Sequence, residues 1–115
     1  MTITRIETGP RMSKAVIHGN TVYLAGQVAT DYNGTIEKQT AEVLETIDKL
    51  LAEVGSSKEK LVTAMLYITD FDQKEGMNEA WLEWLPAEHL PTRATIGVAE
   101  LGKDVLIEIV VSAVR

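Results

Sequence analysis

The stretch LPTRATIGVAELGKDVLIEIVVSAVR, residues 90–115, decides the fold that we expect for this chain. Residues 93–99 and 105–114 are rich in β-branched and other apolar side chains, so they predict two closing strands. Each strand holds one charge in an otherwise apolar run: Arg93 begins the first, and Glu108 interrupts the second. Where these two charges lie bears on both the fold and the function.

The alternation of side chains between the two faces of a strand predicts where the charges lie. One face of the first strand carries the even-numbered residues 94–98, and one face of the second carries the odd-numbered residues 105–113, all of them apolar. If the two strands form an antiparallel hairpin, these apolar faces must coincide to make a core. Arg93 and Glu108 are then expected to share the opposite face.

That opposite face is itself partly apolar, because it also carries Leu106, Val110 and Val114. An apolar sheet surface of this kind usually finds a partner. We therefore predict that the chain associates with itself through this face and buries Arg93 and Glu108 near a subunit boundary.

Local patterns predict the remaining elements. Gly19-Asn20 between two β-prone runs signals a two-residue hairpin, and apolar residues at spacings of three and four indicate two helices. The expected order is an edge strand at 3–7, a hairpin of 14–18 and 21–26, a helix at 36–54, a strand at 61–69, a helix at 73–85 capped by Asp70 or Asp72, and the two closing strands. This order predicts one α+β domain over residues 1–115, with both helices packed on one sheet.

Each predicted helix has one apolar face. The first presents Ala41, Leu44, Ile47, Leu51 and Val54, with Leu50 alongside, and the second presents Met77, Ala80, Trp81 and Trp84. Because helical spacing already accounts for the two tryptophans, we interpret them as core residues and not as a ligand platform.

Composition excludes several classes of protein. A formal net charge of −6 disfavours a broad nucleic-acid interface, which needs clustered Lys and Arg. The chain has no cysteine, so it has no disulfide and no thiolate metal site, which is compatible with a reducing cytoplasm. No apolar run reaches about 18 residues, and the first residues lack the apolar segment of a signal peptide, so we expect a cytoplasmic protein without a membrane span.

Metal and nucleotide sites also lack support. His18 lies at the hairpin turn and His89 in a loop bounded by prolines, and neither has a second histidine at metal-ligand spacing. The sequence contains no glycine-rich phosphate loop and no GxSxG motif.

Several motifs together resemble one known family. Pro91, Arg93 and Ile96, followed by Ile107-Glu108-Ile109, are similar to the C-terminal signature of the RidA/YjgF family of enamine/imine deaminases, which is also labelled endoribonuclease L-PSP or translation inhibitor. Gly26-Gln27 and the hairpin before it resemble the family's N-terminal segment. EVLETIDKLLAEVGSS and FDQKEGMNEAW resemble its two helices, so the resemblance covers nearly the whole chain.

The resemblance implies a fold and a reaction. The fold is a chorismate-mutase-like α+β domain with a mixed sheet, which assembles as a homotrimer with sites in the clefts between subunits. The reaction is hydrolysis of 2-aminoacrylate and related enamines or imines to 2-oxo acids and ammonia, without a cofactor or a metal. The implied partners are small imino or enamino acids, or other small carboxylates.

The resemblance also implies roles for individual residues. Arg93 would anchor the substrate carboxylate, because a guanidinium matches a carboxylate in a bidentate arrangement. Glu108 would hold or activate the attacking water. Backbone groups at Gly26 and Thr95 would line the site.

The sequence departs from the family pattern near the pocket. Met12 stands where the best-studied members have a tyrosine, with Arg11 beside it as a candidate second cation. Ala25 replaces a small hydroxyl residue, and the loop between Gln27 and the first helix is shorter. These departures predict a divergent branch with an altered pocket and an altered substrate preference.

Three alternatives stay open at this point. Arg93 and Glu108 are also explained by a structural ion pair at a subunit interface. The second alternative is a protein of the same fold that is not an enzyme, but binds a small carboxylate and regulates a partner. An endoribonuclease is the third alternative, although the acidic charge and the absence of a histidine pair weigh against it.

Overall fold

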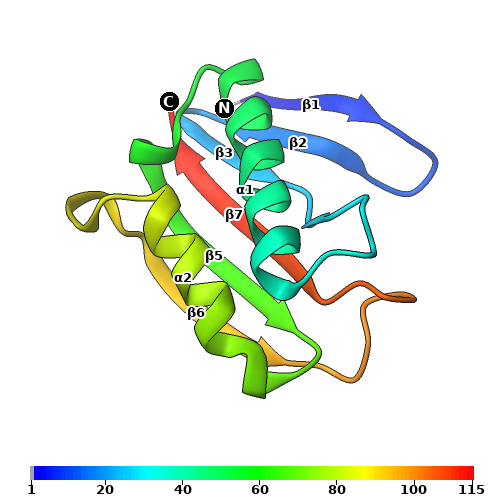
Figure 1. Ribbon diagram of the computed structural model, residues 1–115. Helices are drawn as coiled ribbons and strands as arrows, with labels where there is room; N and C mark the ends of the chain where they lie inside the picture. The colour runs from blue at the N-terminus through cyan, green and yellow to red at the C-terminus, as the bar shows by residue number, and fades with distance from the viewer. Residues whose placement is uncertain (1) are drawn as a thin grey trace.

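Two helices cover one face of a mixed β-sheet in the computed structural model, which describes residues 2–115 (Figure 1). The strands are β1 (Ile3–Thr8), β2 (Ser13–His18), β3 (Thr21–Leu24), β4 (Gln27–Val28), β5 (Leu61–Ile68), β6 (Thr92–Gly97) and β7 (Ile107–Val114). The helices are α1 (Ile36–Glu53) and α2 (Lys74–Trp84), with short 3₁₀ turns at Lys58–Lys60, Phe71–Gln73 and Ala87–His89. The predicted α+β class, the order of elements and the placement of both helices on one face are confirmed.

The order of strands across the sheet is β1-β2-β3-β7-β5-β6, and the short β4 also pairs with β7. All neighbouring strands are antiparallel except β5 and β6, which are parallel. Parallel neighbours need a long crossover connection, and α2 supplies it here by carrying the chain from the end of β5 to the start of β6. As a result β6 forms one edge of the sheet and β1 forms the other.

The predicted hairpin between the two closing strands is wrong, because β5 lies between β6 and β7. Ala64 of β5 is aligned with both Arg93 and Val111, so Arg93 shares the face that the helices cover. Three residues further along β5, Tyr67 is aligned with both Ile96 and Glu108, and these side chains lie on the opposite face. Arg93 and Glu108 therefore lie on opposite faces of the sheet and not on the common face that alternation predicted.

The core lies between α1, α2 and the sheet. Leu44, Ile47 and Leu51 of α1 and Met77 and Trp81 of α2 are buried, as the helical spacing predicts. Ala41 is exposed, so its assignment to the buried stripe is wrong, and Val43 occupies the core position instead.

The glycines predicted at the β2–β3 turn and at the end of α1 have the expected backbone conformation, but the predicted helix cap does not form. Gly19, at the β2–β3 turn, has φ of +63°, and Gly55, just after α1, has φ of +81°, both in the region that favours glycine. The expected cap of the second helix by Asp70 or Asp72 is wrong, because the N-cap of α2 is Gln73, whose side chain makes no capping hydrogen bond. The Asp70 carboxylate instead accepts a hydrogen bond from the Asp72 backbone N–H at 3.0 Å and caps the 3₁₀ turn before α2.

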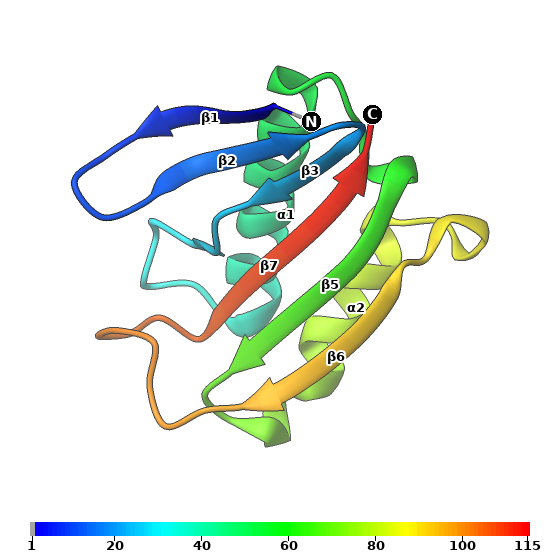
Figure 2. The ribbon, with the colours of Figure 1, turned by 180° about the vertical axis from the view of Figure 1, so that it is seen from behind.

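The second face of the sheet has no helix over it (Figure 2). Tyr23, Ile96 and Val114 on this face are exposed by 51%, 38% and 41%. The prediction that Leu106 lies on this face is wrong. Leu106 precedes β7, packs against the core and lies beside the first turn of α1. No helix among residues 2–115 combines the length and the apolar composition that crossing a membrane requires.

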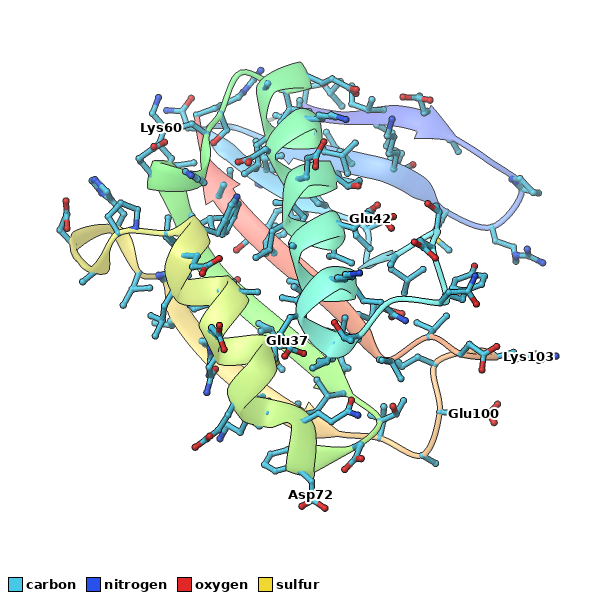
Figure 3. The ribbon with its side chains drawn as sticks, in the orientation of Figure 1. Glu37, Glu42, Lys60, Asp72, Glu100 and Lys103 are labelled. Atoms are coloured by element: carbon cyan, nitrogen blue, oxygen red, sulfur yellow. The ribbon has the colours of Figure 1, made fainter. Side chains whose placement is uncertain are left out.

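Two polar side chains of α1 bind loops next to the sheet: Gln39 binds the loop before β7, and Glu42 binds the loop after β4. The Gln39 side chain is 1% exposed; its Nε2 donates to the Asp104 carbonyl at 3.0 Å, and its Oε1 accepts from the Leu106 N–H at 2.9 Å. Glu42 extends from α1 toward the loop after β4 and accepts hydrogen bonds from the backbone N–H of Thr30 and Asp31 (Figure 3). These bonds lower the pKa of the Glu42 carboxyl below its ordinary value.

The Gln39 contacts predict a large stability loss from a change that keeps volume. Gln39→Leu would leave the Asp104 carbonyl and the Leu106 N–H without their partner, and unsatisfied backbone groups of this kind cost about 1–3 kcal/mol each. We expect the free energy of unfolding in urea to fall by about 2 kcal/mol or more. Gln73→Leu is the matched control, since the Gln73 side chain makes no capping hydrogen bond at α2; equal losses in the two variants would contradict the prediction.

Candidate active site

Arg93 lies on the edge strand β6, beneath α2. Its Cζ atom is 5.6 Å from the centroid of the Trp81 ring, within the range of a cation–π contact. A cavity of about 300 Å³ opens beside it, lined by Asn78, Trp81, Leu82, Leu90, Pro91 and Arg93. Arg93 is thus the only cation among the residues that line this cavity.

The Arg93 charge has no carboxylate partner within residues 2–115. The ion pairs there are Lys14 with Glu7 and Glu53, and Lys49 with Glu45. Partial burial lowers the pKa of Arg93, because desolvation disfavours its charged form. A half-buried guanidinium without a counter-charge favours an anion, and a carboxylate fits its planar fork best.

Two further polar groups on the helix-covered side lack partners. Thr95 lies two residues after Arg93 on the same face of β6, and its Oγ1 is buried without a hydrogen-bond partner. Asn78, on α2, is one of the residues that line the cavity, and its Oδ1 atom is also buried without a hydrogen-bond partner. Unsatisfied buried polar atoms are rare in folded proteins and often mark functional sites.

Glu108 lies on β7, on the uncovered face of the sheet, with Gly26 against it. Pairing of Val28 with Glu108 and of Gln27 with Ile109 brings the start of β4 to this strand. A Cβ atom added to Gly26 would lie only 3.0 Å from the Glu108 Cδ atom, so only glycine leaves room for this carboxylate. Within the described chain the carboxylate takes part in no ion pair.

Arg11 and Met12 form the tip of the β1–β2 hairpin and are exposed, Met12 by 64%. The Ala25 N–H donates to the Lys14 carbonyl at 3.0 Å, so the chain that leaves this tip runs beside the segment that leads to Gly26. The tip lies toward the β1 edge of the sheet, away from β6 (Figure 2).

The predicted site residues therefore fall into two groups. The anchor group contains Arg93 and Thr95, on the helix-covered face at the β6 edge. The carboxylate group contains Gly26 and Glu108, on the uncovered face. Arg93 and Glu108 form no ion pair with each other within one chain, so the ion pair at a subunit interface, which was an alternative explanation, would have to join two subunits.

Sequence reasoning missed the wall of the Arg93 cavity. Asn78 is the i−3 neighbour of Trp81 on α2, and a polar residue there reads as part of a solvated face. Trp81 is 3% exposed, which confirms its place in the core, yet its ring also supports Arg93. Among the described residues no three His, Asp or Glu side chains gather as metal ligands would.

The chain matches one family model and several curated proteins over nearly its whole length. A family model described as Endoribonuclease L-PSP matches residues 2–115. A RutC family protein of Haemophilus influenzae is 41% identical over 117 residues, with 98% of both chains covered. The RutC family protein YoaB of Escherichia coli is 36% identical, also with 98% of both chains covered.

Solved structures agree with these matches. A member of the YjgF protein family from Neisseria meningitidis superimposes with a TM-score of 0.94 at 35% identity, covering 100% of this chain and 96% of the other. A structure from Yersinia pestis, described as a protein of unknown function of the conserved Rid protein family, gives a TM-score of 0.90 at 28% identity, with 99% and 100% coverage.

The contact between Gly26 and Glu108 predicts the effect of one methyl group. Gly26→Ala would displace the Glu108 carboxylate, and because a side chain can turn away more easily than backbone, we expect a stability loss below about 1.5 kcal/mol. A crystal structure of the variant would show Glu108 in another rotamer. The control is Gly9→Ala, where the added Cβ meets the Met12 carbonyl at an ordinary 3.7 Å; an unmoved Glu108 in Gly26→Ala would contradict the prediction.

Proposed function

The chain belongs to the endoribonuclease L-PSP family, whose members also bear the names RutC, YjgF and Rid, and on that premise we propose that it is a hydrolase that deaminates 2-imino and 2-enamino acids. Water and the C=N group of the substrate would yield a 2-oxo acid and ammonia. The observation that carries the proposal is the half-buried Arg93 without a carboxylate partner, set in a cavity.

Arg93 would bind the carboxylate that every 2-imino acid carries. Two parallel N–H···O bonds fix the plane of the substrate as well as its position. The Trp81 ring, which lies against the guanidinium, restricts the orientation of that fork. Thr95 lies two residues along β6 on the same face, and its backbone would line the site.

Glu108 would handle the water. Its carboxylate would accept a proton as water adds to the C2 atom of the imine, and it would return that proton to the nitrogen, which then leaves as ammonia. Water supplies the new C–O bond and the protons, so no oxidant and no cofactor enters the balance. Gly26 leaves the space that this carboxylate occupies.

We further propose that the site is completed between copies of the chain, in a homotrimer. Arg93 and Glu108 lie on opposite faces of one sheet, so one chain does not present both groups to one small molecule. The anchor group of one subunit would face the carboxylate group of the next, with Arg11 and Met12 at the rim. The exposed apolar side chains Tyr23, Ile96 and Val114 on the uncovered face support such packing.

A second candidate function is carboxylate binding without turnover. It uses the same Arg93 cavity and is favoured by the exposed Met12 in the hairpin that would border the site, since a thioether offers no proton to the reaction. Cleavage of RNA, the activity in the family name, has less support, because the chain carries a net charge of −6.

The deaminase proposal predicts one outcome each for the wild type and two variants. 2-Aminoacrylate generated in place by a serine dehydratase should become pyruvate faster with the wild type than without it. Arg93→Ala should remove the acceleration, since losing a buried charged anchor costs about 2–5 kcal/mol. Glu108→Gln should lower kcat while the affinity for 2-oxobutanoate stays near the wild-type value. Binding of 2-oxobutanoate without acceleration would support the second candidate and contradict the enzyme.

The shared site predicts complementation between inactive variants. Arg93→Ala and Glu108→Ala, each inactive alone, should regain activity when they are unfolded together and refolded as mixed oligomers, because some boundaries then receive an intact Arg93 from one chain and an intact Glu108 from another. The double variant mixed with wild type is the control for dilution. No recovery in mixed oligomers verified by mass spectrometry would contradict a site made by two subunits.

A further inference from the structure

The Trp81 ring contacts a second tryptophan as well as Arg93. The centroids of the Trp81 and Trp84 rings are 5.8 Å apart, and the ring planes are inclined at 50°, within the range of favourable aromatic pairs. The two residues are three apart on α2, a spacing that brings helical side chains together. Because the Arg93 Cζ atom is 5.6 Å from the Trp81 centroid, a single ring separates Trp84 from the guanidinium.

Trp84 is held at both its side chain and its backbone. Its indole N–H donates a hydrogen bond to the Asp48 carboxylate, on α1, at 2.9 Å. The Lys58 ammonium donates to the Trp84 carbonyl at 2.7 Å and lies 5.5 Å from the centroid of the Trp84 ring, within the range of a cation–π contact. Trp84 is the last residue of α2, where carbonyl groups have no partner within the helix. Groups from outside α2 therefore fix this end of the helix.

The hydrogen bond to Asp48 does more than satisfy the indole N–H. Trp84 is only half-buried, so water could bond to that N–H if the indole were turned outward. Apolar packing between α1 and α2 has no preferred direction, and rotation of an aromatic ring about its Cβ–Cγ bond is broad. One hydrogen bond at the ring edge selects one of these orientations. The bond to Asp48 thus determines which surface the Trp84 ring presents to Trp81.

We propose that Asp48 and Trp84 are positioning residues for the Arg93 anchor. Asp48 orients the Trp84 ring, which limits the tilt of the Trp81 ring. The Trp81 ring in turn limits the plane in which the Arg93 guanidinium lies. Bidentate binding of a carboxylate needs that plane, and ordering a mobile side chain on binding costs affinity. The inference rests on the proposed role of Arg93 as the carboxylate anchor and extends it to residues that do not line the cavity.

Calorimetric titration with 2-oxobutanoate tests the role of Asp48. Asp48→Leu removes the acceptor at similar size and should weaken binding about three- to tenfold, since the effect passed on cannot exceed the worth of the lost hydrogen bond. Asp48→Asn keeps an acceptor oxygen and should restore most of the affinity. Trp84→Phe keeps an aromatic ring but loses the N–H, so it should weaken binding to a similar degree. The double variant Asp48→Leu/Trp84→Phe should bind no worse than either single variant.

A spectroscopic measurement separates positioning from a loss of stability. The chain has two tryptophans, so labelling with 5-fluorotryptophan gives two fluorine NMR resonances, which Trp84→Phe assigns. In the wild type 2-oxobutanoate should shift the Trp81 resonance, and in Asp48→Leu that resonance should already be displaced or broadened without ligand. Glu45→Leu is the matched control. It removes another carboxylate of α1, one that pairs with Lys49, and should keep the wild-type affinity and spectrum.

The outcomes distinguish this inference from the proposed function. If Asp48→Leu binds as tightly as Glu45→Leu, or if the losses from Asp48→Leu and Trp84→Phe add in the double variant, the positioning role is wrong and the Arg93 anchor stands. If the wild type does not bind 2-oxobutanoate, the anchor and the positioning role are both wrong. If binding follows the expected pattern while no imine is hydrolysed, the positioning role stands and the deaminase is wrong.

Discussion

The parallel pairing of β6 with β5 is the constraint on which the arrangement of functional groups depends. It follows from the crossover through α2, which returns the chain to the same end of the sheet from which β5 began. The register that results turns Arg93 and Thr95 toward the helix-covered side, where Trp81 lies against Arg93 and Asn78 lines the same cavity. An antiparallel β6 directly beside β7 would have put Arg93 and Glu108 on one face, the one that no helix covers.

The site is made of groups that the fold leaves unsatisfied. Arg93 is partly desolvated without a counter-charge, and the Thr95 hydroxyl and the Oδ1 atom of Asn78 are buried without partners. Each buried atom without a partner costs stability, and the buried apolar residues of α1, α2 and the central strands must offset that cost. Gln39 illustrates the opposite case: it is equally polar and fully buried, but both of its amide atoms are bonded, so it serves the fold.

The sequence predicted the features that depend on near neighbours along the chain. Helical spacing located α1 and α2, and Gly19-Asn20 located the β2–β3 hairpin, because these patterns act over a few residues. Strand order is a long-range property, and alternation within 94–98 does not reveal which strand lies beside them. Ala94 and Ile96 looked like core residues, yet they lie on the uncovered face. Gln39 and Asn78 escaped notice because a polar residue on a helix normally reads as exposed.

Separating Arg93 from Glu108 within one chain has a chemical consequence. A guanidinium and a carboxylate on adjacent positions of one face would bind each other, and the anchor would then have to break an ion pair before it could take a substrate. On opposite faces of the sheet each group keeps its full capacity for hydrogen bonds. In the proposed oligomer they meet only across a boundary, where the substrate lies between them and the distance is set by rigid strands of two subunits. The position of Arg93 on an edge strand suits this arrangement, because only an edge lets a side chain beneath a helix also reach a neighbouring chain.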